Sequence, residues 1–428
     1  MTESDEQQQQ ALGLAYLRLI GIAALIGIPA AVVAALFLGT VHVMERWLWD
    51  DLPTAMGVSS PPWFLVLGLP TAGAAIVVLA RRFLPGDGGH PPMHGLSSDA
   101  TPVAYVPGVV LAALGSLPFG AVLGPELPVI ALGTAVGVLA NRFARLSGRE
   151  AAVLTNAGSF SAISALFGGP LVAGVLLVEG GLSAGAALIP VLLPGLVAAA
   201  VGYLIFVGLG SWAGLGTPGL VVPALPVYDG ELITDLLVGI AVGVLAVIVV
   251  AVIKALAVRT DAVRDRVGMP LLLLGGGLAV GALALLAGAL GANPQDVLFS
   301  GQASIGVVVG AGSVSLVLVL VLAKALAYAI SLGCGYRGGP IFPAIFLGVG
   351  LAAVAVVVLG TSPTLAVAVG AAAGMAAQTR LLLSSILLAA LLVGPNGADA
   401  VPAAVMAATA AWLAAAMLPA RLSPASRT

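Results

Sequence analysis

The chain has 428 residues, of which 60% are hydrophobic and only 8% are charged, and its formal net charge is −2. Soluble domains carry about 25% charged residues, so this composition excludes a soluble globular protein and indicates an integral membrane protein. The long continuous apolar segments predict spanning α-helices, because a membrane β-barrel would alternate apolar and polar residues. The single cysteine excludes an internal disulfide and a cysteine metal cluster.

Apolar segments follow one another along the whole chain. Residues 1–10 are polar and predict a cytoplasmic tail, and residues 11–38 predict a long spanning helix. Further apolar segments are expected at residues 63–80, 103–123, 129–140, 151–167, 170–178, 184–207, 232–258, 270–290, 305–332, 341–359, 365–377, 381–392 and 400–418. The 57 Gly and 28 Pro residues predict broken and re-entrant helices, which a bilayer tolerates only inside protein or beside a cavity.

Basic clusters predict the orientation of the chain. Residues 81–82, 142–149 and 259–266 are rich in arginine and fit cytoplasmic loops, whereas residues 50–62 and 208–230 lack Lys and Arg and fit the outside. We therefore expect a multi-pass protein of the inner (plasma) membrane with both termini in the cytoplasm.

One carboxylate lies between two long apolar stretches. Glu126 stands in Gly124-Pro-Glu-Leu-Pro128, and an ionisable group at this depth is a functional-site hypothesis by default. Pro125 and Pro128 suit the first turn of a helix, and Gly124 allows a sharp turn before it. Glu126 is thus expected at a helix N-terminus, where unpaired N–H groups and the helix dipole favour negative charge.

A similar pattern occurs in the second half of the chain. Gly339-Pro-Ile-Phe-Pro343 again places a glycine and prolines before an apolar helix. Two broken helices at corresponding places predict an inverted repeat with its site near mid-membrane. The expected organisation is a first membrane half at residues 11–207, a connection at 208–231 and a second membrane half at 232–418. A second cytoplasmic tail is expected at 419–428.

Three Gly/Pro turns precede apolar segments: Asp87-Gly-Gly-His-Pro91, the Glu126 turn and the Gly339 turn. Three helix N-termini aimed at one point would bind an anion through backbone N–H groups and partial charge. Such dipoles would hold chloride moderately, whereas a lysine in the path would hold it too tightly to release it. The alternative is three ordinary helix breaks.

At these turns the sequence resembles the CLC chloride channel and transporter family. That family has a Gly-Ser-Gly-Ile-Pro turn, a Gly-Lys/Arg-Glu-Gly-Pro turn and a Gly-x-Phe-x-Pro turn in the same order. The segments 168–179 and 323–340 are also similar to the family. The resemblance implies an all-α polytopic membrane protein with a CLC-type inverted repeat of broken and re-entrant helices, assembled as a homodimer with one anion pathway per subunit.

The resemblance also implies roles for particular residues. Glu126 matches the family's gating glutamate, which competes with chloride and takes up a proton. The implied anion-binding residues are Gly88, Gly89, His90, Pro125, Glu126, Leu127, Gly339, Pro340, Ile341 and Phe342. The implied function is transport of chloride or a similar small anion, channel-like or coupled to protons.

The sequence departs from the family at four places. The central serine falls on Gly88, the phenylalanine of the third turn falls on Ile341, and the inner tyrosine has no counterpart after Tyr336. Of two consecutive glutamates on the proton path, the first is kept as Glu179 and the second is Gly180. Either Glu179 relays protons along a path with Glu126, or the protein conducts passively; Glu179 can equally be a polar helix-end residue.

Other functions remain as alternatives. An inverted-repeat carrier for another anion, such as fluoride, is one. A membrane enzyme using Glu126 as a base is less favoured, because no partner nucleophile is visible. His90 and His94 are poor metal ligands in a Gly/Pro turn, so no metal, cofactor or nucleic-acid partner is expected. Lys324 and Arg380 interrupt apolar runs and are expected to pair with helix-end carbonyls.

Overall fold

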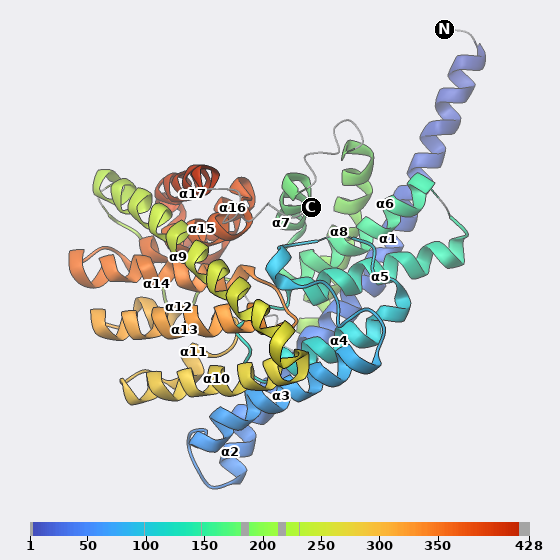
Figure 1. Cartoon of the computed structure of the whole chain (residues 1–428). Helices are drawn as coiled ribbons and strands as arrows, with labels where there is room; N and C mark the ends of the chain where they lie inside the picture. Colours follow the sequence, from blue (N-terminus) through green and yellow to red (C-terminus); the bar gives the residue numbers. More distant parts are fainter. Residues whose placement is uncertain are drawn as a thin grey trace. The chain divides into compact units, whose positions relative to one another are not determined.

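The computed structural model describes residues 3–97, 99–146, 148–180, 188–212, 220–230 and 232–418. The predicted tail at 419–428 and part of the predicted connection at 208–231 lie outside these residues. The described chain consists of helices joined by turns and short loops (Figure 1). Nine of the described helical segments are long and apolar enough to cross a membrane. The prediction of an all-α polytopic membrane protein is therefore confirmed.

The helices pack into two compact units. The first unit contains Met1–Gly39, Ser98–Val106 and Val129–Pro218, and the second contains the remainder, Thr40–Ser97, Pro107–Pro128 and Gly219–Thr428. These units do not follow the two predicted sequence halves, because segments from both halves share the second unit. The inverted repeat of residues 11–207 and 232–418 stays a prediction.

The first unit is held together by close helix contacts. Its helices are most of α1 (Glu3–Arg46) and α5 (Glu126–Ala144), with η3 (Val103–Tyr105), α6 (Gly148–Leu166), α7 (Pro170–Gly180) and α8 (Leu188–Trp212). Ser161 Oγ donates to Gly27 O at 2.7 Å, and Ser164 Oγ donates to Ala199 O at 3.1 Å. Small residues at these positions let the backbones approach, as is usual between helices in a membrane.

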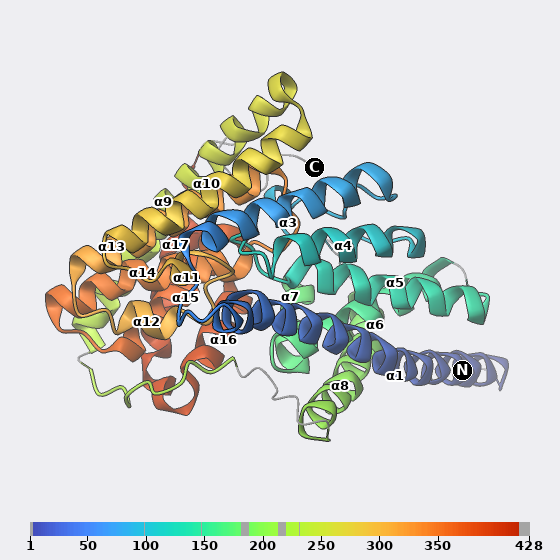
Figure 2. The same ribbon diagram turned by 90° about the horizontal axis from the view of Figure 1, so that it is seen from below.

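The second unit contains the remaining helices. They are η1 (Trp47–Asp51), α2 (Leu52–Ala55), α3 (Trp63–Phe83), η2 (Pro92–His94), most of α4 (Val106–Ser116), α9 (Leu232–Val267), α10 (Met269–Ala289), α11 (Pro294–Val297), α12 (Ile305–Val309), α13 (Val314–Cys334), α14 (Ile341–Leu359), α15 (Pro363–Thr379), α16 (Leu382–Val393), η5 (Gly394–Ala400) and α17 (Val401–Met417). Helix α3 lies beside α10, as Figure 2 shows, while α14 packs on α13 and α15.

Several predicted boundaries differ from the structure. The apolar run at 305–332 is two helices, because Gly310 and Gly312 interrupt it; Gly312 has φ of 61°. Helix α9 continues through the basic cluster to Val267. The segment predicted at 103–123 leaves the helix after Ser116. The non-helical stretch that follows leads directly to Glu126.

Candidate functional site

Glu126 is the first residue of α5, as predicted, and its side chain is fully buried in the second unit. The turn before it pairs with the turn before α14. Gly124 N donates to Gly339 O at 2.8 Å, and Gly339 N donates to Gly124 O in return. The two Gly/Pro turns therefore form one antiparallel bridge. This pairing brings the predicted residues of the second and third turns into a single site.

The carboxylate of Glu126 binds the N-terminus of α14. Its Oε1 accepts hydrogen bonds from Ile341 N at 3.1 Å and from Phe342 N at 2.9 Å. Its Oε2 is buried and has no hydrogen-bond partner among the described residues. Pro340 has no N–H, so Ile341 and Phe342 are the first donors of this helix. The carboxylate thus lies at a helix end where unpaired N–H groups and the helix dipole favour negative charge.

Glycine is required on both sides of this carboxylate. A Cβ atom added to Gly339 would overlap Glu126 Oε2 and lie 2.8 Å from Glu126 Cβ, and one added to Gly124 would lie 2.6 Å from Glu126 Cδ. The close approach, rather than a special backbone conformation, therefore explains both glycines.

Side chains that the sequence did not single out hold the two turns in place. Tyr328 Oη donates to Pro340 O at 3.0 Å. Ser331 Oγ accepts from Val122 N at 3.1 Å. Both come from α13, three residues apart, and so share one helix face. In the sequence, their three-residue spacing shows only that they share a helix face. Their role in holding the turns follows from the packing of α13 on α14.

The first turn is placed beside the third by arginines. Arg337 Nε and Nη2 donate to Asp87 O at 3.0 and 2.8 Å, and Nη2 also contacts Asp87 Oδ2 at 2.6 Å. Arg81 Nε contacts Asp87 Oδ1 at 2.8 Å. The backbone N–H of Arg337 donates to Ser116 Oγ at 3.0 Å. Asp87 therefore contacts an arginine that lies 250 positions further along the sequence.

Neighbouring side chains leave little room for a side chain at position 88. A Cβ added to Gly88 would lie 2.8 Å from Ala112 Cβ, 3.2 Å from Arg81 Cγ and 3.3 Å from Arg337 Cγ. Gly88 has φ of 72°, which glycine adopts at low cost. Burial and the nearby Arg81 lower the pKa of Arg337 to about 10, so Arg337 is charged at neutral pH.

The expectation that the first turn opens an apolar helix is wrong. Only the 3-10 turn Pro92–His94 follows it, and Gly95 at φ of 84° ends that turn. Two consecutive prolines disfavour a helix here, because each lacks an N–H and restricts the preceding residue. Gly89 N donates to Gly86 O at 2.9 Å. The predicted anion contacts of Gly88, Gly89 and His90 stay predictions.

The remaining predicted residues have clear positions. Leu127 is buried in the first turn of α5. Glu179 lies at the end of α7 in the first unit, and its part in a proton path stays a prediction. His90 and His94 have ring centroids 6.0 Å apart. The described residues contain no group of three or more His, Cys, Asp or Glu suited to a metal ion.

Lys324 and Arg380 pair with carbonyl groups, as predicted. Lys324 Nζ donates to Leu298 O at 2.8 Å and to Phe299 O at 3.3 Å. It also lies 4.6 Å from the ring centroid of Phe346 on α14. Arg380 Nη2 donates to Ala415 O near the end of α17.

The chain matches known proteins over most of its length. The family model described as voltage gated chloride channel matches residues 72–415. Relatives named ion-transport protein YfeO, from Salmonella newport (strain SL254) and Salmonella agona (strain SL483), are 30% identical over 343 residues, which cover 77% of this chain and 78% of each relative.

Solved structures share the fold. A slow cyanobacterial Cl−/H+ antiporter has a TM-score of 0.75 at 16% identity, covering 93% of this chain and 94% of its own. A CLC-type fluoride/proton antiporter has a TM-score of 0.70 at 20% identity, covering 93% of this chain and 95% of its own. The all-α fold with paired Gly/Pro turns, the family model and the relatives agree: the chain belongs to the CLC family of voltage-gated chloride channels and related transporters.

Proposed function

We propose that this chain moves chloride, or a closely related small anion, across the membrane through a pathway gated by Glu126. One observation carries the proposal. The Glu126 carboxylate accepts the first two N–H groups of α14, at 3.1 and 2.9 Å. A helix N-terminus binds small anions in the same way, so the carboxylate occupies a ready-made anion site.

Protonation is the proposed opening step. The ionised carboxylate competes with a dissolved anion for the N–H groups of Ile341 and Phe342. A protonated carboxyl has no charge for these groups to stabilise. It then leaves the helix end, and the anion replaces it. Backbone dipoles bind the anion moderately, which permits both entry and release.

The flow is either channel-like or coupled to protons. Where the family has two consecutive glutamates, this chain has Glu179 followed by Gly180. The retained Glu179 supports coupled exchange through a proton relay with Glu126, and Gly180 supports passive flow. Fluoride is the second candidate substrate, because the first turn has glycine in place of the serine hydroxyl and the donors at Glu126 are backbone N–H groups.

The proposed setting is the inner membrane, with both termini in the cytoplasm and two subunits that each contain one pathway. The arginine clusters at 81–82, 142–149 and 259–266 support this orientation. Membership of the family supports the homodimer. Neither feature is needed for the chemistry at Glu126.

The deciding experiment is anion flux from liposomes that hold the purified full-length chain. Liposomes are loaded with either chloride or fluoride, and the released anion and external pH are recorded together. Chloride release is expected, and release that drives protons against their gradient would establish exchange. Fluoride release without chloride release would favour the second candidate. If neither anion moves, and Glu126→Gln is also silent, the proposed function is wrong.

A further inference from the structure

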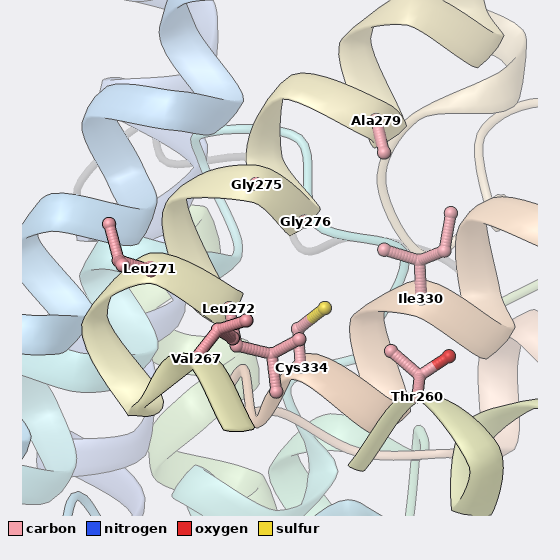
Figure 3. A pocket seen from close by; sticks show the side chains of 9 residues that line it. All are labelled: Thr260, Val267, Leu271, Leu272, Gly275, Gly276, Ala279, Ile330 and Cys334. Carbon is pink, nitrogen blue, oxygen red and sulfur yellow. The ribbon is translucent and has the colours of Figure 1, made fainter. Parts of the chain in front are cut away.

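An apolar cavity lies within the second unit between α9, α10 and α13. Its volume is about 330 Å³, which is within the range of pockets that hold small ligands. Figure 3 shows Leu272 and Ala279 of α10 on the side that faces Ile330 and Cys334 of α13. Its one hydroxyl, Thr260 Oγ1, donates to Leu256 O at 3.0 Å. The cavity therefore suits a hydrocarbon chain.

A cation stands beside the cavity on α9. Thr260 and Val267 line the cavity, and Arg264 lies four residues after Thr260 and three before Val267, on the same helix face. The side chain of Arg264 is 46% exposed and contacts Asp261 at 3.3 Å. An exposed pair of this kind contributes little free energy, so a phosphate can replace Asp261 as the partner of Arg264.

The depth of Arg264 in the membrane is also appropriate. The apolar part of α9 gives way at Arg259 to a stretch containing Arg264 and Arg266. Arginines at such a boundary lie at the level of the lipid headgroups. A lipid with its phosphate at Arg264 would thus have its acyl chains level with the apolar cavity.

We propose that this cavity binds one acyl chain of an anionic glycerophospholipid whose phosphate is held by Arg264. This inference goes beyond anion transport and does not depend on it. Cys334 lines the cavity and is the last residue of α13, directly before the segment that leads to α14. Two residues after Cys334, Tyr336 Oη donates to Pro70 O at 3.1 Å and to Leu273 O of α10 at 3.4 Å. Occupancy of the cavity is therefore expected to stabilise this segment.

Two substitutions separate the roles of cavity and charge. A Cβ at Gly275 has no neighbour within 4 Å, so Gly275→Leu fills the cavity without a backbone clash. Gly68 on α3 also has no neighbour within 4 Å, and Gly68→Leu is its matched control. Arg264→Gln removes the headgroup partner, and Arg266→Gln, six residues from Thr260 and on another face, is the control for charge.

The test uses the purified full-length chain after removal of native lipid. Phosphatidylglycerol or phosphatidylcholine with identical acyl chains is added, and bound lipid is counted by native mass spectrometry. Wild type should bind one phosphatidylglycerol about fivefold more tightly than phosphatidylcholine, as one arginine near a lipid surface predicts. Arg264→Gln should abolish this preference, and Gly275→Leu should lose the bound lipid of either kind.

A second measurement uses the single cysteine. Cys334 lines the cavity, so bound phosphatidylglycerol should slow its alkylation by N-ethylmaleimide, whereas Arg264→Gln should restore the rate. Equal binding of both lipids by wild type would overturn the proposal. Lipid binding by Gly275→Leu equal to that of Gly68→Leu would overturn it as well.

Discussion

Glu126 Oε1 accepts the backbone N–H of Phe342 at 2.9 Å, across 216 residues of sequence. The first residue of α5 thereby caps the first turn of α14. A glutamate usually stabilises the N-terminus of its own helix. Here the carboxylate reaches another helix, because the bridge between Gly124 and Gly339 brings the two helix starts together. The cap is therefore removable without unwinding α5.

Removing the charge of Glu126 should remove the pH dependence of transport. Wild-type flux should rise as the pH falls, because protonation weakens the attraction between the carboxylate and the N–H groups of α14. The rise can reach about tenfold per pH unit where the carboxylate is mainly ionised, since the protonated fraction changes by that factor. Glu126→Gln should give a flat profile in liposome flux measured from pH 5 to 8.

Glu150 provides the control for this experiment. It is exposed in the first turn of α6, so Glu150→Gln should keep the wild-type profile. An unchanged pH profile in Glu126→Gln would remove Glu126 from the gating role.

Gly339→Ala should destabilise the protein through Glu126. The added methyl group overlaps Glu126 Oε2 and lies 2.8 Å from Glu126 Cβ, and overpacking of this kind costs about 1–3 kcal/mol. In a Glu126→Gly background the obstructing atoms are absent, so the same alanine should have a smaller effect. Thermal unfolding of all four proteins in detergent gives this coupling. If Gly339→Ala lowers the stability equally in both backgrounds, the added methyl group does not clash with Glu126.

Arg337→Gln should loosen the first turn. It removes the guanidinium that binds Asp87 O at 3.0 and 2.8 Å, and it leaves that carbonyl without these donors. The expected loss is about 1–3 kcal/mol of unfolding free energy, mainly from the two bonds to the Asp87 carbonyl. The ion pair with the Asp87 side chain adds little to this loss, because that side chain is 58% exposed. Thermal unfolding between pH 6 and 8 should show the same loss throughout, because the pKa of Arg337 is about 10.

Arg264→Gln is the comparison for Arg337→Gln. Arg264 and its partner Asp261 are 46% and 34% exposed, so its removal should cost less than about 1 kcal/mol in detergent without added anionic lipid. Equal melting temperatures for the two variants would mean that Arg337 does not hold the first turn.

Local sequence patterns predicted the parts of the site that depend on local backbone chemistry. The start of α5 at Glu126 and the start of α14 at Ile341 both follow from a glycine and prolines before an apolar run. Burial of Glu126 follows from its apolar flanks. These features need only a few neighbouring residues, so a sequence can specify them without knowledge of the tertiary fold.

Long-range contacts could not be predicted from the sequence. The contact between Arg337 and Asp87 joins segments 250 residues apart, and neither residue belongs to a pattern that predicts the other. The prediction that the first turn opens a helix was wrong because Gly and Pro occur both at helix starts and in loops. Here Pro91 and Pro92 prevent an α-helix. Tyr328 and Ser331 acquire a role only because α13 packs against the turns.

Lys324 should support the segment before Glu126 through Phe299. Its Nζ binds Leu298 O and Phe299 O, and Phe299 has φ of 61°, a strained conformation for a residue other than glycine. Phe299 N in turn donates to Gly120 O at 3.4 Å. Trp49 packs edge-on against Phe299, with ring centroids 5.3 Å apart, and donates to Pro118 O at 2.9 Å.

Lys324→Met should therefore lower the melting temperature by removing two hydrogen bonds, together worth about 1–3 kcal/mol, and the contact with the Phe346 ring. Lys254→Met is the matched control, because among the described residues Lys254 Nζ donates to one carbonyl group, Gln378 O at 3.2 Å. Both variants are compared by thermal unfolding and by the pH profile of flux. Lys324→Met should be the less stable variant, with a pH profile that still rises toward acid, since Glu126 and its N–H donors remain. Equal stability of the two variants would show that the Phe299 conformation does not depend on Lys324.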